Sequence, residues 1–411
     1  MFLAKLAFKN LVRHRNRTLI TASIIAIAIF FFLLLDSLIG GMTEMSYDTI
    51  INYEAGHLQL AHREYWEEEE ELPLENLISG GQIFTSIEEV PGYYGSSPEL
   101  NFPARLNNGF NELPVMGKGI IPDKFTRVFP IKDKFVEGEM FSRGEYKVVM
   151  GKRLAELMKL QLGDYITLLV KDKNETFNTI EAEISGLIHT ANPNVNRNIV
   201  YLPLDIAQQT LGVGNRVSKV IVRLEDKELA SMAARELKKQ LGKTETGLGV
   251  YPWSELEAVT IAGAKNAGNQ LVLTIILIIA AIAIINTVIL AALERMEEIG
   301  MMKAMGLRVK EIVFVFVAES TGIGILGGSV GILMGAIGVW FLNSYGIDFS
   351  IMTNMDMTSF GIPILGKVYG IWNPSSFIMV FAFGIVVSLL SSILPAYWAA
   401  AKDPIKAIYH R

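Results

Sequence analysis

Four apolar runs, each long enough to cross a membrane, divide the chain into alternating segments. A helix rises about 1.5 Å per residue, so about 20 residues span a hydrocarbon core of about 30 Å. Each run meets that length, and the pattern predicts an integral membrane protein with four transmembrane helices. The runs cover residues 18–40, 269–293, 312–342 and 377–401.

The start of the chain has two possible interpretations. A secretory signal has an apolar core of only about 7–15 residues followed by a small-residue cleavage site. The run at 18–40 is longer, which favours an uncleaved membrane span. Ahead of it, Leu3, Ala7 and Leu11 recur at helical spacing while the basic residues fall elsewhere on the helical wheel. Residues 1–17 are therefore predicted to form an amphipathic helix lying along the cytoplasmic membrane surface.

The distribution of lysine and arginine orients the four spans. Basic residues gather before the first run, between the second and third runs, and after the fourth, whereas the connection 343–376 contains Lys367 alone. By the positive-inside rule both termini are cytoplasmic. Residues 41–268 then form one large periplasmic domain, and 343–376 form a short periplasmic connection. The predicted cytoplasmic segments are 1–17, 294–311 and 402–411.

The large domain mixes strands of period two with short helices, which predicts an α+β fold with two subdomains. Residues 61–125 show no clear periodicity. Ser254 and Glu257 have the spacing of a capping box, which would start a helix that runs directly into the second span. The predicted strands are 146–150, 165–171, 178–187, 218–224 and 247–251, and the predicted helices are 151–160 and 226–241.

The segment ERMEEIGMMKAMGLRVK, residues 294–310, separates the second and third runs. Its acidic residues precede its basic ones, a charge order that favours a short helix, and Gly306 is placed to end that helix. Its four methionines supply unbranched, polarizable side chains that can fill a groove on another protein. The alternative is a tight turn whose methionines contact only lipid headgroups.

The third run contains features that plain lipid-facing helices do not need. Glycine recurs there at four-residue spacing, which predicts close helix packing, although glycine is also common in membrane helices generally. Glu319 lies within the same run and costs a few kcal/mol unless it is paired or reaches the interface. Because no second carboxylate accompanies it, we expect a structural role. The glycines are Gly324, Gly327, Gly328, Gly331 and Gly335.

Composition excludes several kinds of chemistry. The chain is 51% hydrophobic and has no cysteine, so disulfides, thiolate metal sites and cysteine nucleophiles are excluded. A net charge of −5 argues against a nucleic-acid partner, and no phosphate-binding G-x-x-x-x-G-K-[ST] loop occurs. His57 and His62 are badly spaced for a metal site, and the run Glu67–Glu71 is expected to be a solvated surface. We predict no catalysis, no metal and no bound cofactor for this chain.

The segment ERMEEIGMMKAMG, Glu319 with the glycine repeat, and LPAYWAAAKDPIKAI near the end of the chain together resemble a known superfamily. It comprises the permeases of macrolide-exporter and lipoprotein-releasing ABC transporters and the cell-division permease. The block GHLQL and residues 161–188 are more similar to the lipoprotein-releasing branch. One subunit of that branch carries a long hook that recruits a periplasmic chaperone. The turn KDKNE is much shorter here, so the chain resembles the hookless partner or a relative with another cargo.

This resemblance implies an inner-membrane permease that works with a separate ABC ATPase dimer, which would bind the ATP and magnesium. It also implies a second permease copy or paralogue, membrane lipid, and a lipoprotein or other amphiphilic cargo, with a periplasmic chaperone or adaptor as a further possible partner. The alternatives are an efflux permease with a periplasmic adaptor, or a regulator of a cell-wall hydrolase that transports nothing.

The resemblance also assigns roles to particular residues. Segment 294–311 would be the coupling helix, with the ATPase contact formed by Glu294, Arg295, Glu297, Glu298, Gly300, Met301, Lys303, Ala304 and Gly306. An apolar groove for the cargo's acyl chains, lined by residues of the first and second spans, would face a partner helix and open near the periplasmic end, although ordinary lipid-facing surface is the alternative. Its candidate residues are Phe30, Phe31, Leu34, Leu35, Ile275, Ile276 and Ile279.

Overall fold

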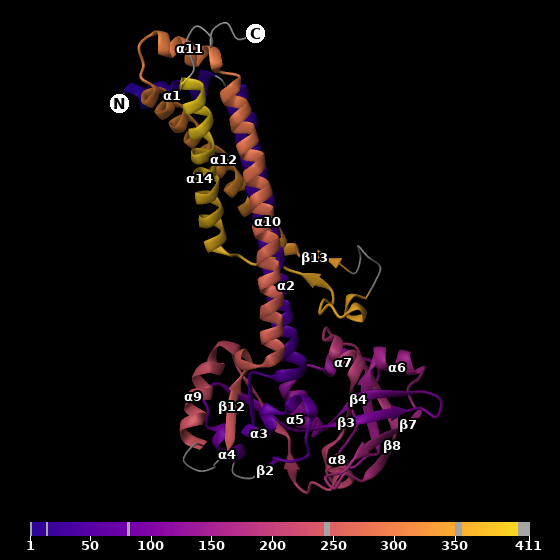
Figure 1. Ribbon diagram of the computed structural model, residues 1–411. Coiled ribbons are helices and arrows are strands. Elements are labelled where there is room, and N and C mark those ends of the chain that lie inside the picture. Colours follow the sequence, from indigo (N-terminus) through magenta and orange to yellow (C-terminus); the bar gives the residue numbers. More distant parts are fainter. Residues whose placement is uncertain (1, 14, 80–82, 242–246, 350–355, 402–411) are drawn as a thin grey trace. The chain divides into compact units, whose positions relative to one another are not determined.

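The computed structural model describes residues 2–13, 15–79, 83–241, 247–349 and 356–401, and these form two compact units (Figure 1). The predicted tail 402–411 lies outside the described residues. We call the first unit the membrane unit; it comprises Met1–Thr43, Lys265–Asp348 and Lys367–Arg411. We call the second the extramembrane domain; it comprises Glu44–Ala264 and Phe349–Gly366.

Among the described residues, four helices are long and apolar enough to cross a membrane, as predicted. All four are longer than the apolar runs, because the helical backbone continues into polar sequence. The first spanning helix is α2, which continues to Ile50. The amphipathic helix before it, α1, ends at Arg13 and not at residue 17 as predicted. The helices are α1 (Phe2–Arg13), α2 (Arg15–Ile50), α10 (Glu257–Leu293), α11 (Met296–Ala304), α12 (Val309–Tyr345) and α14 (Pro374–Ala401).

Glycines of α12 lie against the backbones of two neighbouring helices in the membrane unit. A Cβ atom built on Gly327 would lie 2.6 Å from the carbonyl oxygen of Ala22 in α2. On Gly324 it would lie 3.2 Å from the carbonyl oxygen of Gly384 in α14. A larger residue at Gly327 would collide with a backbone atom that cannot rotate away, and one at Gly324 would be tightly crowded. The glycine repeat therefore sets how closely α12 can approach α2 and α14.

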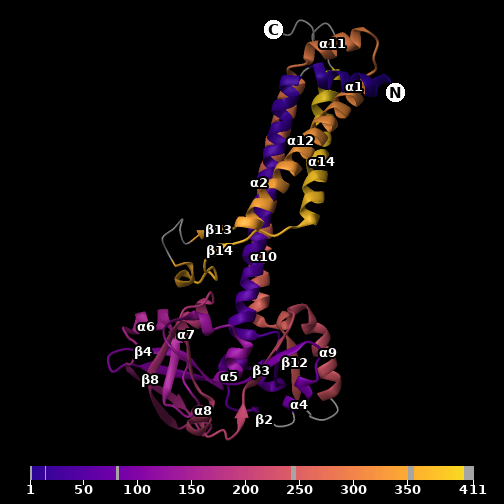
Figure 2. The same ribbon diagram turned by 180° about the vertical axis from the view of Figure 1, so that it is seen from behind.

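The extramembrane domain is built on a ten-stranded sheet, part of which closes on itself (Figures 1 and 2). Six strands pair in the ring β3–β4–β9–β6–β8–β7–β3, and β11, β1 and β12 extend the sheet from β3 as an open wing. The strands are β1 (Leu58–His62), β3 (Tyr93–Asn107), β4 (Glu112–Ile120), β5 (Phe135–Gly138), β6 (Lys147–Gly151), β7 (Tyr165–Lys171), β8 (Phe177–Ile188), β9 (Ile199–Pro203), β11 (Lys219–Leu224) and β12 (Leu248–Pro252).

Strand β3 belongs to both the wing and the ring. Its first residues, from Tyr93 to Glu99, pair with β11, and its last four, from Ala104 to Asn107, pair with β7. The ring and wing pairs are antiparallel except β4 with β9 and β6 with β8. Because one strand is shared, the two parts of the sheet are joined through a continuous backbone.

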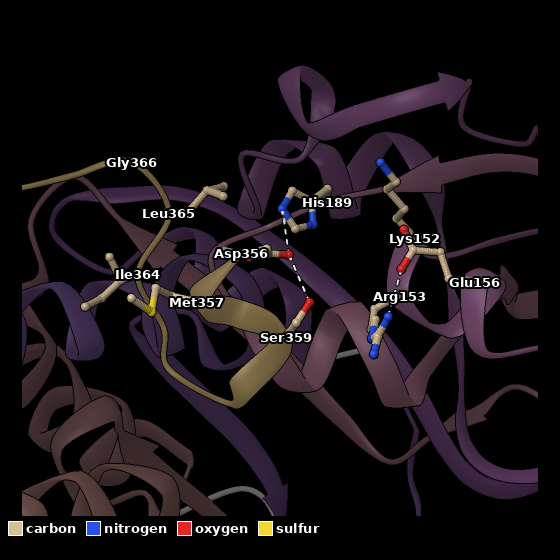
Figure 3. Close-up of a pocket in the computed structure, with 10 residues that line it drawn as sticks. All are labelled: Lys152, Arg153, Glu156, His189, Asp356, Met357, Ser359, Ile364, Leu365 and Gly366. Carbon is tan, nitrogen blue, oxygen red and sulfur yellow. Dashed lines mark hydrogen bonds and ion pairs between the residues drawn. The ribbon is translucent and has the colours of Figure 1, made fainter. Parts of the chain in front are cut away.

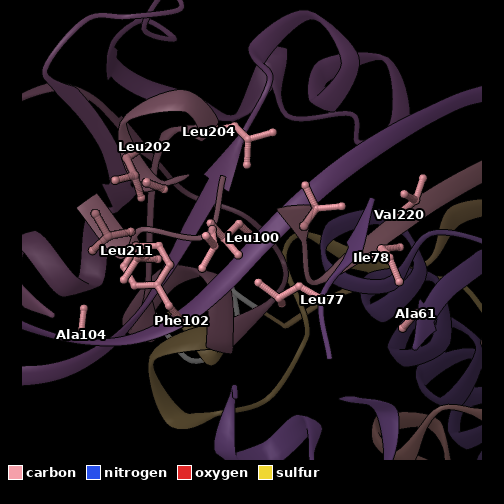
Figure 4. Close-up of a cluster of buried hydrophobic side chains, with 14 of the residues drawn as sticks. Ala61, Leu77, Ile78, Leu100, Phe102, Ala104, Leu202, Leu204, Leu211 and Val220 are labelled. Carbon is pink, nitrogen blue, oxygen red and sulfur yellow. The ribbon is translucent and has the colours of Figure 1, made fainter. Parts of the chain in front are cut away.

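Side chains of β9 alternate between two hydrophobic cores on opposite faces of the sheet. Leu100, Phe102 and Leu202 enter the larger core, where Leu204 and Leu211 of α8 cover them (Figure 4). Tyr201 enters the smaller core beside α5 and α7. The helices of this domain are α3 (Arg63–Glu67), α4 (Ile83–Glu88), α5 (Pro122–Val128), α6 (Lys152–Met158), α7 (Pro193–Asn198), α8 (Leu204–Leu211) and α9 (Ala230–Leu241).

The predicted alternation in the second half of the domain is confirmed. Strand β7 has the predicted bounds, and it forms an antiparallel hairpin with β8 across the turn KDKNE. The predicted capping box does not start the long helix, but the predicted helix that runs directly into the second span is confirmed as α10 (Glu257–Leu293). Ser254 lies in the 3-10 turn Trp253–Glu255, and α10 begins only at Glu257. The chain bends at Leu256, whose extended backbone ends that turn before the long helix starts.

The connection 343–376 is more than the short link predicted. Its residues Phe349–Gly366 belong to the extramembrane domain. Two contacts to that domain explain this: Asn196 of α7 donates a hydrogen bond to the Thr358 hydroxyl at 3.3 Å, and His189 Nε2 lies 3.6 Å from Asp356 Oδ2. Polar side chains therefore fix this segment, and the sequence pattern alone gave no sign of the pairing.

Candidate functional site

The helix α11 lies in the membrane unit between α10 and α12, at the same end of that unit as α1 (Figures 1 and 2). It begins with Glu297 and Glu298 in its first turn and has Lys303 in its last, the charge order that favours a helix. Gly306 follows with φ +94°, a left-handed conformation that suits glycine and ends the segment. Residues 294–311 therefore contain the short helix that the sequence predicted.

One face of α11 is anchored inside the membrane unit. Met296 and Ile299 are buried in a cluster with Phe316 of α12 and with alanines of α14. The Lys303 ammonium donates a hydrogen bond to the carbonyl oxygen of Ala400 at 3.0 Å. A displacement of α11 would therefore be transmitted directly to α12 and α14.

The residues predicted to contact an ATPase are divided between the two faces of this segment. Gly300 is buried and Glu298 and Lys303 are half-buried. Met301 is 52% exposed, and the neighbouring Met305 is 73% exposed. The exposed surface thus carries glutamates and methionines, with the basic Arg308 and Lys310 at its far end. The predicted residues on it are Glu294, Glu297, Met301, Ala304 and Gly306.

Arg295 does not lie on the exposed face. It is 3% exposed, and its Nη1 lies 2.5 Å from Oε2 of Glu319, which is equally buried. Its Nε lies 3.5 Å from Glu298 Oε2, and its guanidinium lies 5.6 Å from the centre of the Phe316 ring. The structure therefore corrects the predicted role of Arg295: it is the buried partner of Glu319. Sequence reasoning missed the pair because it looked only for a second carboxylate.

The candidate groove residues are not brought together as one surface. Phe30 and Leu34 lie against Gly338 of α12, and Leu35 packs in the core of the membrane unit. Phe31, Ile275 and Ile279 are exposed by 55%, 55% and 62%, and Ile276 is half-buried. In a membrane these exposed side chains would meet lipid or a partner.

The extramembrane domain contains a cleft of about 420 Å³ between α6 and residues 356–366 (Figure 3). Arg153 and Glu156 line one side, and His189, Asp356 and Ser359 lie opposite. Burial raises the pKa of Asp356, but hydrogen bonds from Thr358 and the nearby His189 lower it by more, so the net shift is downward. This carboxylate therefore stays charged and holds the segment in place.

The described residues contain no group of three or more histidine, aspartate and glutamate side chains arranged to hold a metal ion. His57 has a structural partner instead, since its Nδ1 accepts the backbone N–H of Leu224 at 3.1 Å. Burial, reinforced by Arg223, lowers the pKa of His57 to about 4, which keeps its imidazole neutral. His57 thus serves as a neutral hydrogen-bond acceptor within the fold.

Two domain families match the chain in the order that the structure shows. The MacB-like periplasmic core domain matches residues 18–240, and the FtsX-like permease C-terminal domain matches residues 271–404. The chain belongs to the MacB/FtsX superfamily of ABC transporter permeases. The extramembrane domain thus corresponds to the MacB-like core, and α10 to α14 correspond to the FtsX-like part.

Relatives from both branches of this superfamily are similar to the chain. The lipoprotein-releasing system transmembrane protein LolC of Xylella fastidiosa is 23% identical over 77% of this chain and 78% of its own length. The macrolide export ATP-binding/permease protein MacB 2 of Aeromonas hydrophila is also 23% identical, over 98% of this chain and 60% of its own length. The periplasmic region of MacB from Actinobacillus actinomycetemcomitans matches 50% of this chain with a TM-score of 0.37.

Proposed function

We propose that this chain is the permease subunit of an inner-membrane ABC transporter whose ATPase is a separate chain, and that it releases lipoproteins from the outer leaflet. The observation that carries the proposal is α11, a short helix with an exposed face of methionines and glutamates and an opposite face anchored on α12 and α14. The sequence has no phosphate-binding loop, so ATP and magnesium belong to the partner.

The exposed residues of α11 are the proposed contact with the ATPase dimer. Methionine adapts to an irregular groove, and the exposed glutamates set the charge that the partner must match. Because α11 rests on the ends of α12 and α14, a displacement by the ATPase would move these helices. The orientation with α11 in the cytoplasm and the large domain in the periplasm follows the distribution of lysine and arginine.

Lipoprotein is the proposed cargo because relatives named LolC and LolE match about four fifths of the chain. A lipid anchor leaves the outer leaflet sideways, so it must pass an apolar surface of the spans. The exposed side chains Phe31, Ile275 and Ile279 are the proposed surface. A second permease copy or paralogue facing these helices would complete the pathway, with a periplasmic chaperone or adaptor receiving the cargo.

A photocrosslinking side chain at position 31 should capture lipoprotein before ATP is added and lose most of it afterwards. The matched control is position 32, because Phe32 is only 2% exposed whereas Phe31 is 55% exposed. The experiment uses the chain together with its ATPase in membranes, and immunoblotting measures the captured protein. Capture of phospholipid alone at position 31, unchanged by ATP, would contradict the lipoprotein proposal and leave this surface as lipid-facing.

A further inference from the structure

A second and larger cavity, of about 770 Å³, lies in the extramembrane domain. The helical turn Ile51–Ala55, which continues from α2, forms one wall, and the loop after α3 forms another. The floor is the sheet itself, through Gln59 of β1, Lys219 of β11 and Met116 of β4. None of the roles proposed above uses this cavity.

The walls of the cavity are strongly acidic. Seven glutamates line it, including the run Glu67–Glu71, against one cation, Lys219. Glu54 accepts hydrogen bonds from Asn192 and Asn194 at 3.0 and 2.9 Å, and Glu69 turns inward onto Lys219. The other four glutamates of the run are exposed at the rim. The sequence predicted a solvated surface for this run, and its position around a cavity emerges only from the fold.

The single cation on the floor is already neutralised. Lys219 Nζ donates to Gln59 Oε1 at 3.0 Å and pairs with Glu69 Oε1 at 2.5 Å. Burial alone would lower the pKa of Lys219, but the attraction of Glu69 and Glu99 outweighs burial and raises it. A ligand that enters the cavity would therefore find the paired Lys219 ammonium at the floor and an excess of carboxylates along the walls.

Two buried side chains of β3 supply unused hydrogen-bond acceptors on the same face of the sheet. Glu99 pairs in register with Lys219, and Asn101 pairs with Lys118, two residues from Met116. Strand residues two apart share a face, so Glu99 and Asn101 lie beneath the floor between these cavity residues, and neither lines the cavity itself. They are 0% and 2% exposed.

These acceptors have no hydrogen-bond partner among the described residues. Within the described part of the chain, neither carboxylate oxygen of Glu99 accepts a hydrogen bond, nor does the Oδ1 of Asn101, and the buried Lys118 ammonium forms an ion pair with Glu99 at 3.7 Å, beyond hydrogen-bond distance. Burial raises the pKa of Glu99 despite its two lysine neighbours. A buried acceptor without a donor costs about 1–3 kcal/mol.

An aromatic wall completes the cavity. Trp66 lines it and stacks on Tyr251 with ring centroids 3.8 Å apart and planes 2° apart. An indole face beside carboxylates attracts alkylammonium groups, because the ring quadrupole and the negative charges act in the same direction. The volume is far larger than a metal ion requires. We propose that this cavity binds an alkylammonium group, carried by a lysine side chain of a polypeptide or by a small polyamine, between Trp66 and the rim glutamates.

The test is tryptophan fluorescence of the detergent-purified full-length chain, titrated separately with spermidine and with a blocked lysine-containing pentapeptide. Saturable quenching is expected, and Trp66→Phe should remove it. The triple variant Glu67→Gln, Glu70→Gln, Glu71→Gln should weaken binding about tenfold. The matched control, Glu137→Gln, Glu139→Gln, Glu181→Gln, removes three exposed carboxylates elsewhere in the same domain and should leave affinity within about twofold.

Raising the salt concentration from about 0.05 M to about 0.5 M should also weaken binding, because rim charges are screened. Tighter binding of the pentapeptide would identify a polypeptide source, and tighter binding of spermidine would identify a polyamine. Three results would overturn the proposal: no saturable quenching, equal losses in the two triple variants, or Mg²⁺ binding with the affinity of spermidine. The titration needs no ATPase and no cargo, so its result is independent of the proposed transport function.

Discussion

Glu319→Leu should destabilise the membrane unit by about 3–5 kcal/mol, the largest loss we expect from a single substitution in this chain. The Arg295 guanidinium and the Glu319 carboxylate are both buried, with Nη1 and Oε2 2.5 Å apart. Removing the carboxylate leaves the buried guanidinium with only the half-buried Glu298, whose Oε2 lies 3.5 Å from Arg295 Nε, as a counter-ion. The Arg295 side chain is 3% exposed, and its guanidinium lies 5.6 Å from the centre of the Phe316 ring.

The double variant Arg295→Met, Glu319→Leu is the matched control for this prediction. Replacing both members of a buried ion pair with apolar residues of similar size is often neutral or even stabilising. We therefore expect the double variant to recover most of the stability that the single variant loses. Unfolding in mixed detergent micelles, followed by circular dichroism, measures both. If the double variant were as unstable as the single one, the pair would not be the source of the loss.

Gly331→Leu should be the second most damaging substitution, costing about 1–3 kcal/mol and separating α12 from α2. A Cβ atom on Gly331 would lie 2.9 Å from the carbonyl oxygen of Ala26 and 2.8 Å from the Cβ of Ile29. Both are atoms that cannot rotate away, so the two helices must move apart to admit the side chain.

Gly268→Leu is the control for Gly331→Leu. Gly268 lies in α10, and a Cβ atom built on it would have no other atom within 4 Å. The same unfolding measurement should give Gly268→Leu a stability close to that of the wild type, since leucine is also the better helix former. Comparable losses for the two variants would mean that leucine at any of these helical glycines is harmful, and that close packing at Gly331 is not the cause.

The spans and the second half of the extramembrane domain could be predicted because their patterns are local. The length of the four apolar runs identifies the spans. The alternation of buried and exposed residues identifies β7 and β8 as strands. Residues 61–125 gave no pattern because β3 is buried on both faces from Gly95 to Phe102, which removes the alternation. Periodicity cannot detect a strand that has no solvent-facing side.

The long-range features could not be predicted for a different reason. Arg295 and Glu319 are separated by 24 residues and meet only because the segment that contains α11 packs against α12 and α14. Likewise, Asn196 reaches Thr358 across 162 residues. Nothing in the local sequence around either residue specifies its partner. Only the packing of whole elements brings these polar side chains together.

Met301 offers the most direct test of the proposal that a separate ATPase docks on α11. The chain has no cysteine, so a single introduced cysteine can be labelled without background. Met301 is 52% exposed, whereas Glu298 lies 3.5 Å from Arg295, and reversing its charge would disturb the buried pair as well. A probe at Met301 therefore reports on docking alone.

Met301→Cys, treated with a cysteine-to-lysine crosslinker in membranes, should become joined to the ATPase subunit. The control is Met379→Cys, because Met379 is 48% exposed but lies near the start of α14, far along that helix from the alanines that contact α11. We predict an ATPase adduct from position 301 and none from position 379. An intact complex that gives no adduct at 301, or equal adducts at both positions, would contradict the assignment of α11 as the coupling helix.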